Sequence, residues 1–342
     1  MQIFLSSLLI VEVFIFCFAG ALFFLRRNYG FPGAFGLGIL VTMSGLSVLY
    51  QTQFILGVPW LAVLVEIFCL GISISYCLKC PLSSMGIGSL KAFVSSHKYT
   101  VVPLVVVVGY LFAQSVLLYP NNVDSLVYHL PRVLLFQQNG TFFLDSTHMH
   151  HIVVFPVGSD ILYHHFLRLQ LSRGLAFFSI LAYVGTILGA YALVRGHFSS
   201  RAAWLGALVV AGLPEFVIMS TTPKNDIQVV FAGIISLVLL SRILVNGRLL
   251  DFSLLALALC YAVSAKTTGI AISVPIFAAA VFLLKKKKII PCTMYCFPKA
   301  LETPLPITTC PLNPLPGMAI CVQFTTLGGL VRPRILEEPW DT

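Results

Sequence analysis

Three clusters of polar residues interrupt an otherwise apolar chain, and their residue types suit chemistry on hydroxyl and phosphate groups. The first cluster spans residues 122–148, the second spans residues 220–226 and the third spans residues 265–269. A carboxylate such as Asp124 can take a proton from a hydroxyl. Arg132, Lys224 and Lys266 can bind phosphate oxygens, Arg through a bidentate fork and Lys as a point charge. A common centre therefore requires that the three clusters meet on one surface.

Each of these residues also has an ordinary structural interpretation. Asp124 could be a solvated loop residue or a helix cap, and Asp226 precedes an apolar run in the position of an N-cap. Arg132 could anchor the chain to phospholipid headgroups. Lys266 could extend along the lipid toward the interface. Taken singly, none of these residues is specific for catalysis.

Histidines offer a second kind of chemistry. Six of the eight lie within residues 129–165, namely His129, His148, His150, His151, His164 and His165. Imidazole and carboxylate together suit zinc or copper. The H-x-H-H spacing has no fixed geometric partner, so we assign no metal ligands, and assistance by a divalent metal ion stays an open alternative.

The elements that must position these clusters are membrane helices. Hydrophobic residues make up 58% of the 342 residues and charged residues 10%, against about 25% charged in a soluble domain. A spanning helix needs roughly 20 apolar residues, and no strand-like alternation recurs. We therefore predict an all-α polytopic transmembrane bundle. The nine predicted spans are Ile3–Leu25, Phe31–Tyr50, Phe54–Cys77, Thr100–Tyr119, Gly174–Val194, Ala202–Ser220, Asp226–Leu244, Leu249–Ala265 and Thr268–Leu284.

Basic residues predict the orientation. With the N-terminus outside, most of the Lys and Arg lie in cytoplasmic loops, including the run Lys285–Lys288, as the positive-inside rule requires. Anionic lipid then accounts for the net charge of +9, so no nucleic-acid partner is needed. All three polar clusters fall on the non-cytoplasmic side. We expect Gly158–Leu169 to be a helix along the interface, with Ile161, Leu162 and Phe166 towards lipid.

Motifs in the three clusters resemble one family of membrane enzymes. The first reads Asp124-Ser-Leu-Val-Tyr-His-Leu-Pro-Arg132, followed by Gln138-Asn139-Gly140 and Thr147-His148. The others read Thr222-Pro-Lys-Asn-Asp226 and Ala265-Lys-Thr-Thr268. Together they resemble polytopic GT-C glycosyltransferases of the protein-mannosyltransferase-like and lipopolysaccharide-core type. The resemblance covers about residues 100–284.

The resemblance implies inverting transfer of a sugar from a polyprenyl-phosphate donor to a lipid, glycan or protein acceptor on the non-cytoplasmic face. It also implies an integral protein of a bacterial or archaeal plasma membrane, with membrane lipids as further partners. Asp124 is then the candidate base, and Arg132, Lys224 and Lys266 are the candidate donor-phosphate ligands. The candidates for sugar or acceptor binding are Tyr128, His129, His148, Asn225 and Asp226.

One departure from the family pattern concerns the end of the outer loop. Where the family often has an Arg-Gln pair and a Glu after the Thr-His element, this chain has His150, His151 and Asp160. Acceptor recognition could differ, or the site could be degraded.

The chain divides into three parts by composition. Residues 1–99 have three helices, and residues 100–284 form the GT-C-like core with an outer loop at 120–173. Residues 285–342 begin with the basic stop and continue as an irregular, proline-rich tail, which we expect not to be the native continuation of the helices. A polytopic transporter and an inactive transferase fragment are the alternative functions.

Overall fold

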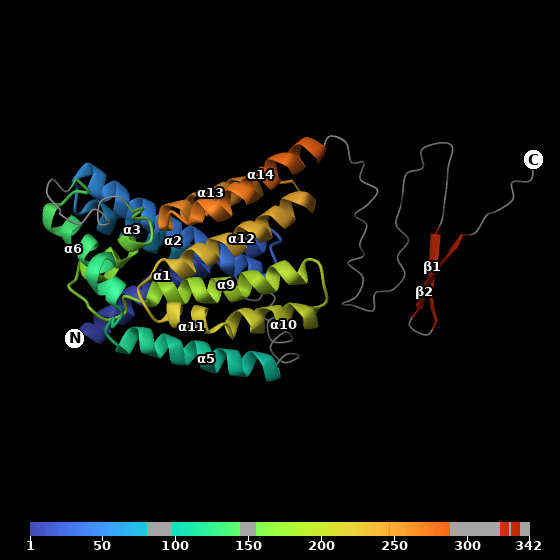
Figure 1. Cartoon of the computed structure of the whole chain (residues 1–342), viewed down its shortest axis with the longest axis horizontal. Coiled ribbons are helices and arrows are strands. Elements are labelled where there is room, and N and C mark those ends of the chain that lie inside the picture. The colour runs from blue at the N-terminus through green and yellow to red at the C-terminus, as the bar shows by residue number, and fades with distance from the viewer. Residues whose placement is uncertain (81–97, 144–154, 246, 288–321, 328–329, 336–342) are drawn as a thin grey trace, which may run out of the picture. The chain divides into compact units, whose positions relative to one another are not determined.

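The computed structural model describes residues 1–80, 98–143, 155–245, 247–287, 322–327 and 330–335 (Figure 1). The chain separates into a helical unit, Met1–Ile290, and a second unit, Pro291–Thr342. In the second unit, the described residues form an antiparallel hairpin of β1 (Val322–Leu327) and β2 (Leu330–Ile335). Sequence periodicity does not predict these two strands.

Every predicted span overlaps helix in the first unit, which confirms the all-α class. The predicted start of the third span, at Phe54, is wrong, because α2 continues to Leu56 and α3 begins at Leu61. The helices that overlap the predicted spans are α1 (Gln2–Arg26), α2 (Phe31–Leu56), α3 (Leu61–Lys79), α5 (Lys98–Leu117), α9 (Phe177–Arg195), α10 (Ser200–Ala211), α11 (Pro214–Ser220), α12 (Asp226–Val245), α13 (Leu249–Ala265) and α14 (Gly269–Lys287). Shorter elements lie between them: the π-helix η2 (Ser125–His129), α6 (Leu130–Asn139), the 3-10 helix η3 (Asp160–Tyr163) and α8 (His164–Leu167).

Not every predicted span is a full, straight crossing. Within the described residues, six helices are long and apolar enough to cross a membrane, and α13 and α14 are apolar but shorter. The predicted span Ala202–Ser220 is wrong as a continuous helix, because α10 and α11 meet at a bend of 64°. The residue before a proline is pushed out of the helical region, and Leu213 before Pro214 has φ −67° and ψ 115°. The sequence therefore breaks this helix at Leu213.

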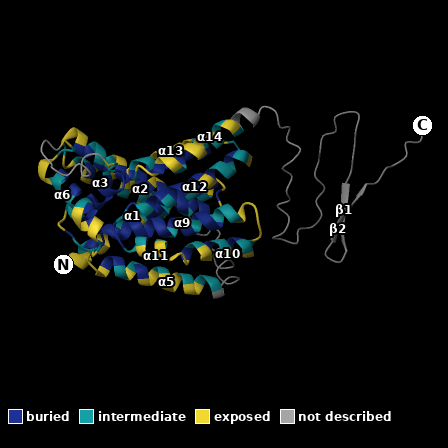
Figure 2. Cartoon of the chain, viewed as in Figure 1, coloured by how far each residue is buried: buried dark blue, intermediate teal, exposed yellow. Residues whose placement is uncertain are grey.

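The core of the helical unit lies along α2, α9 and α12. These three helices are largely buried, whereas α3 and α5 are mostly exposed and apolar (Figure 2). Lipid is the solvent that suits such exposed apolar faces. Close approach of α1 and α2 depends on Gly38, where an added Cβ would lie 2.4 Å from the carbonyl oxygen of Cys17. Small residues commonly permit such helix contacts in membranes.

The segment 158–169 differs from its predicted position along the interface. It forms η3 and α8, and the side chains of Ile161, Leu162 and Phe166 are fully buried. Phe166 packs against the rings of Phe177 and Phe178 on α9, with ring centroids 6.3 and 6.0 Å apart. The predicted lipid-facing orientation is therefore wrong. Amphipathic spacing predicts an apolar face, but it does not distinguish lipid from protein as the neighbour of that face.

Candidate active site

A cavity of about 310 Å³ lies where the three polar clusters meet. Its walls come from η2 and α6, from residues 155–160, from the start of α12 and from the turn between α13 and α14. The polar side chains that line it are Tyr128, Arg132, Asp160, Asn225, Lys266, Thr267 and Thr268. Segments far apart along the chain, from Tyr128 to Thr268, thus contribute to one concave surface, as small-molecule sites usually require.

Asp160 connects the floor of this cavity to η2 and α6. Its carboxylate accepts a hydrogen bond from His129 Nδ1 at 2.8 Å and forms an ion pair with Arg132 Nη1 at 3.1 Å. Arg132 also donates from Nη1 to the carbonyl oxygen of Pro156 at 2.9 Å. All three side chains are almost completely buried. Arg132 therefore does not anchor the chain to lipid headgroups.

Burial also affects the ionisation of groups at the cavity. It lowers the pKa of the Arg132 guanidinium, and the charge of Asp160 opposes that shift. Burial raises the pKa of the Tyr128 hydroxyl to about 12, so Tyr128 is neutral near pH 7 and can donate a hydrogen bond. The floor of the cavity thus combines a guanidinium group, paired with Asp160, and a neutral hydrogen-bond donor.

The C-terminal end of α13 holds two loop residues in place, Asn225 and Ser159. The carbonyl oxygen of Ala265 accepts hydrogen bonds from Asn225 Nδ2 at 3.0 Å and from Ser159 Oγ at 3.1 Å. The helix ends there because Lys266 is extended, with φ −159° and ψ 145°. The ammonium group of Lys266 pairs with Asp226, the first residue of α12. The second and third polar clusters are therefore joined directly.

Asp124 lies beside this cavity but does not line it. Its carboxylate is 53% exposed and forms an ion pair of 2.7 Å with Lys224 Nζ. The adjacent Ser125 donates from Oγ to the carbonyl oxygen of Pro223 at 2.9 Å, which fixes the first cluster against the second. The hydrogen bond from Lys224 lowers the pKa of Asp124, and the charges of His129 and Lys266 act in the same direction. Asp124 is therefore an ionised and accessible carboxylate.

The π-helical turn η2 lies between Asp124 and Arg132. Pro131 follows the π-helix η2, and it lacks the N–H that would bond the carbonyl oxygen four residues earlier. The amide of Leu130 instead donates to the carbonyl oxygen of Ser125. Single π turns of this kind often occur at functional sites. Here the turn lies between Asp124, beside the cavity, and Arg132 at its floor.

The structure thus brings most of the predicted site residues into one region. Tyr128, Arg132, Asn225 and Lys266 line the cavity, whereas the remaining described members contact these residues or each other: His129, Asp226, Asp124 and Lys224. His148 lies outside the described residues. Sequence reasoning assigned no role to Asp160. Its signal in the sequence is an acidic residue within the apolar stretch 152–163.

The described histidines do not converge on one metal centre. His129 binds Asp160, His164 lies between two glutamine amides and His165 contacts Tyr50. Within the described ranges, the group of His, Asp, Glu and Cys side chains spaced for a metal is Glu12, Glu66 and His165. That group lies outside the cavity formed by the polar clusters.

Comparison with known proteins agrees with the sequence motifs. Residues 162–297 match the family described as dolichyl-phosphate-mannose-protein mannosyltransferase, and the matched stretch includes Asn225, Asp226 and Lys266. Neither a curated protein nor a solved structure matches the chain. The family match agrees with the resemblance to GT-C membrane glycosyltransferases predicted from the motifs, and the apolar helices indicate an integral, multi-pass membrane protein.

Proposed function

We propose that the protein transfers a sugar from a polyprenyl-phosphate donor to a hydroxyl of a lipid, glycan or protein acceptor on the non-cytoplasmic face. The observation that carries this proposal is the cavity in which Arg132, Lys266 and Asn225 meet. Arg132 and Lys266 provide cationic groups for a phosphate, and the Oδ1 atom of Asn225, unpaired among the residues that the structure describes, provides an acceptor for a sugar hydroxyl. An isoprenoid tail can remain among the helices while the sugar-phosphate reaches the cavity.

Asn225 supplies the sugar contact. Its side-chain nitrogen donates to the carbonyl oxygen of Ala265, and because a carbonyl only accepts, this bond fixes the orientation of the amide. Its Oδ1 atom is buried and has no hydrogen-bond partner among the described residues. An unsatisfied buried acceptor costs about 1–3 kcal/mol, and a sugar hydroxyl entering the cavity would satisfy it. Tyr128 and His129 complete this side of the proposed sugar site.

The cations stabilise the leaving phosphate. Lys266 is partly exposed and lines the cavity, so its ammonium group can contact phosphate oxygens, while Asp226 holds the side chain in place. Arg132 is buried and already bonded to Asp160 and Pro156, so it contributes positive charge from the floor. Fixed positive charge close to developing negative charge is a major source of catalysis. Lys224 adds charge from the side of Asp124.

Asp124 acts as the base in a single displacement. The acceptor oxygen forms a bond to the anomeric carbon while the bond from that carbon to the phosphate oxygen breaks. The acceptor proton passes to the Asp124 carboxylate, and polyprenyl phosphate leaves with the bonding electron pair. Attack from the face opposite the phosphate inverts the anomeric configuration.

The test measures transfer from radiolabelled polyprenyl-phosphate-mannose in membranes that contain the full chain. Asp124→Asn should lower the rate by about 10²–10⁴-fold, because it removes a general base. Glu215→Gln, which changes an exposed carboxylate on α11, should leave the rate unchanged. Asn225→Leu should raise KM for the donor.

Two results would contradict these assignments. Undiminished transfer by Asp124→Asn would remove Asp124 from the role of base. Failure of the wild-type chain to transfer from any polyprenyl-phosphate hexose or pentose would remove the proposed function.

A further inference from the structure

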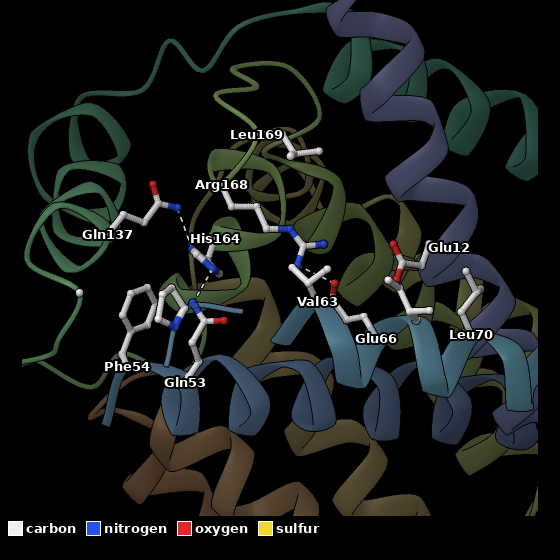
Figure 3. A pocket seen from close by; sticks show the side chains of 13 residues that line it. Glu12, Gln53, Phe54, Val63, Glu66, Leu70, Gln137, His164, Arg168 and Leu169 are labelled. Atoms are coloured by element: carbon white, nitrogen blue, oxygen red, sulfur yellow. Dashed lines mark hydrogen bonds and ion pairs between the residues drawn. The ribbon is translucent and has the colours of Figure 1, made fainter. Parts of the chain in front are cut away.

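A second, larger cavity lies among α1, α2, α3, α6 and α8. It measures about 580 Å³, within the usual range of roughly 300–1,000 Å³ for small-molecule sites. Its polar lining consists of Glu12, Gln53, Glu66, Gln137, His164 and Arg168 (Figure 3). Most of the lining belongs to residues 12–70, which lie outside the stretch that matches the mannosyltransferase family.

Glu66 is bonded within a chain of polar groups at this cavity. Its Oε2 atom pairs with Arg168 Nη1 at 2.5 Å, and its Oε1 atom contacts the hydroxyl of Tyr50. The same hydroxyl lies 2.7 Å from His165 Nδ1. His165 Nε2 lies 3.3 Å from the carbonyl oxygen of Leu9, which can only accept, so Nε2 bears a proton.

The number of protons shared by Glu66, Tyr50 and His165 determines the charge of this hydrogen-bonded group. Tyr50 has one hydroxyl proton, which it can donate either to Glu66 or to His165. If it donates to Glu66, His165 is doubly protonated and Glu66 is ionised. If it donates to His165, Glu66 is protonated and His165 is neutral. Glu66 and His165 together are therefore neutral in both arrangements.

With the Glu12 carboxylate ionised, the whole cluster is also neutral. Arg168 adds one positive charge and the Glu12 carboxylate adds one negative charge, while burial lowers the pKa of His164 to about 3 and leaves it uncharged. A cationic or anionic ligand would enter without a counter-charge, and burying such an ion is costly. Both His165 nitrogens and both Glu66 oxygens already have protein partners. The group Glu12, Glu66 and His165 is thus poorly suited to a metal ion, although its ligand atoms lie within 4.8 Å of one another.

Two polar side chains at the cavity are left unsatisfied. Neutral His164 has one N–H, and amides of Gln137 and Gln53 contact its two nitrogens at 2.7 and 3.2 Å. One amide must therefore face it with oxygen and the other with nitrogen. With its nitrogen towards His164, Gln53 has a buried Oε1 atom without a hydrogen-bond partner among the described residues, and the residue is 3% exposed. The Glu12 carboxylate likewise has no hydrogen-bond partner in the described part of the chain.

Hydroxyl groups match these needs. The Glu12 carboxylate and Gln53 Oε1 both require a hydrogen-bond donor, and a hydroxyl group supplies one. Beside them, Val63, Ile67 and Leu70 form an apolar wall on α3, a helix that is mostly exposed. We propose that this cavity binds a membrane amphiphile with an uncharged, hydroxyl-rich head group, such as a glycosyl group, whose hydrocarbon chain lies along α3. This site is distinct from the cavity assigned to sugar transfer and does not depend on that activity.

The experiment uses the full chain in phosphatidylcholine nanodiscs and three probes with the same diazirine-bearing alkyl chain. The probes are an alkyl glucoside, an alkylammonium and an alkyl sulfate, and mass spectrometry locates the labelled residues. The glucoside should label residues 63–70 about tenfold more than either charged probe. A tenfold difference in affinity corresponds to about one hydrogen bond to a charged group. Glu12→Gln leaves the cluster with a net positive charge, so it should weaken glucoside labelling and increase alkyl sulfate labelling. Glu215→Gln should change neither.

A second variant tests the location. Val63→Trp fills the cavity from an exposed position and should abolish glucoside labelling, whereas Leu64→Trp, at the next position, which is also exposed but does not line the cavity, should not. Preference of the wild-type chain for a charged probe, or equal labelling by all three, would overturn the proposed head group. Labelling that persists in Val63→Trp would overturn the site. Transfer activity is not measured, so these outcomes are independent of the proposed function.

Discussion

Asp124 and Asp160 differ in burial, and the difference decides what each carboxylate contributes. Asp160 is buried between His129 and Arg132, and both of its oxygens face cationic or N–H groups. Asp124 is half exposed and has Lys224 as its ion-pair partner. The first arrangement fixes the floor of the cavity, and the second leaves an ionised carboxylate free to meet a substrate.

Substitution of the two aspartates should affect stability differently. Asp160→Asn leaves the buried Arg132 without its counter-charge, so unfolding of the purified protein in detergent should become easier by about 3–5 kcal/mol. Asp124→Asn removes a surface ion pair, which typically contributes about 0–1 kcal/mol. Chemical denaturation of both variants checks this. Equal stability of Asp160→Asn and wild type would show that the buried pair is not structural.

The pH dependence of transfer should report the pairing of Asp124. Its folded-state pKa is lowered from 3.8, so the contribution of the pair is complete above that value and is lost as pH falls through the lowered pKa. The acid limb of the pH–rate profile should therefore lie below pH 3.8 in the wild type. Lys224→Met should move it upward, and Lys224→Arg should not. An acid limb unchanged by Lys224→Met would separate Asp124 from the reaction.

Short elements, and not the spans themselves, position the candidate site. The turn η2, the start of α6 and the segment 155–160 present Tyr128, Arg132 and Asp160. The buried carbonyl of Ala265 joins two of the loops to α13. The amide of Gly158 donates to the carbonyl oxygen of Ser264 at 2.8 Å, so the backbone there lies directly against the end of α13.

Gly158→Ala tests this contact at the scale of the element. An added Cβ would lie 2.8 Å from the backbone oxygen of Ser264 and closer still to the Ser264 hydroxyl, so the segment must shift. We expect a loss of about 1–3 kcal/mol in stability, as for overpacking, together with reduced transfer because Asp160 moves with the segment. In the control variant Gly109→Ala on α5, the new Cβ meets nothing within 4 Å. A Gly158→Ala protein as stable and active as this control would contradict the argument.

At the scale of the whole molecule, the helices must deliver three distant clusters to one side of the bilayer. The ion pairs Asp124–Lys224 and Asp226–Lys266 already require that the second cluster lie beside both of the others. The distribution of Lys and Arg then predicts which side this is. The basic residues at the opposite helix ends, such as Arg248, face the cytoplasm in this orientation.

Cysteine accessibility checks the orientation. In a background without native cysteines, Asp124→Cys and Lys266→Cys should react with a membrane-impermeant maleimide applied from the non-cytoplasmic side, because both lie at the same partly exposed rim. Arg248→Cys should react only after the membrane is permeabilised. Labelling of Asp124→Cys and Lys266→Cys from opposite sides would exclude a common centre.

Composition and apolar run length determined the all-α membrane class, because lipid admits only segments that satisfy their own backbone hydrogen bonds. The sequence also placed Tyr128, Arg132, Asn225 and Lys266 in one candidate site, since their three motifs fall in loops on the same side. Tertiary structure decided the rest. Whether the apolar face of residues 158–169 meets lipid or protein depends on the partners that Asp160 and Arg168 find on other helices. The neutral cluster around Glu66 likewise combines α1, α2, α3 and α8, and its charge balance exists only once these helices are packed together.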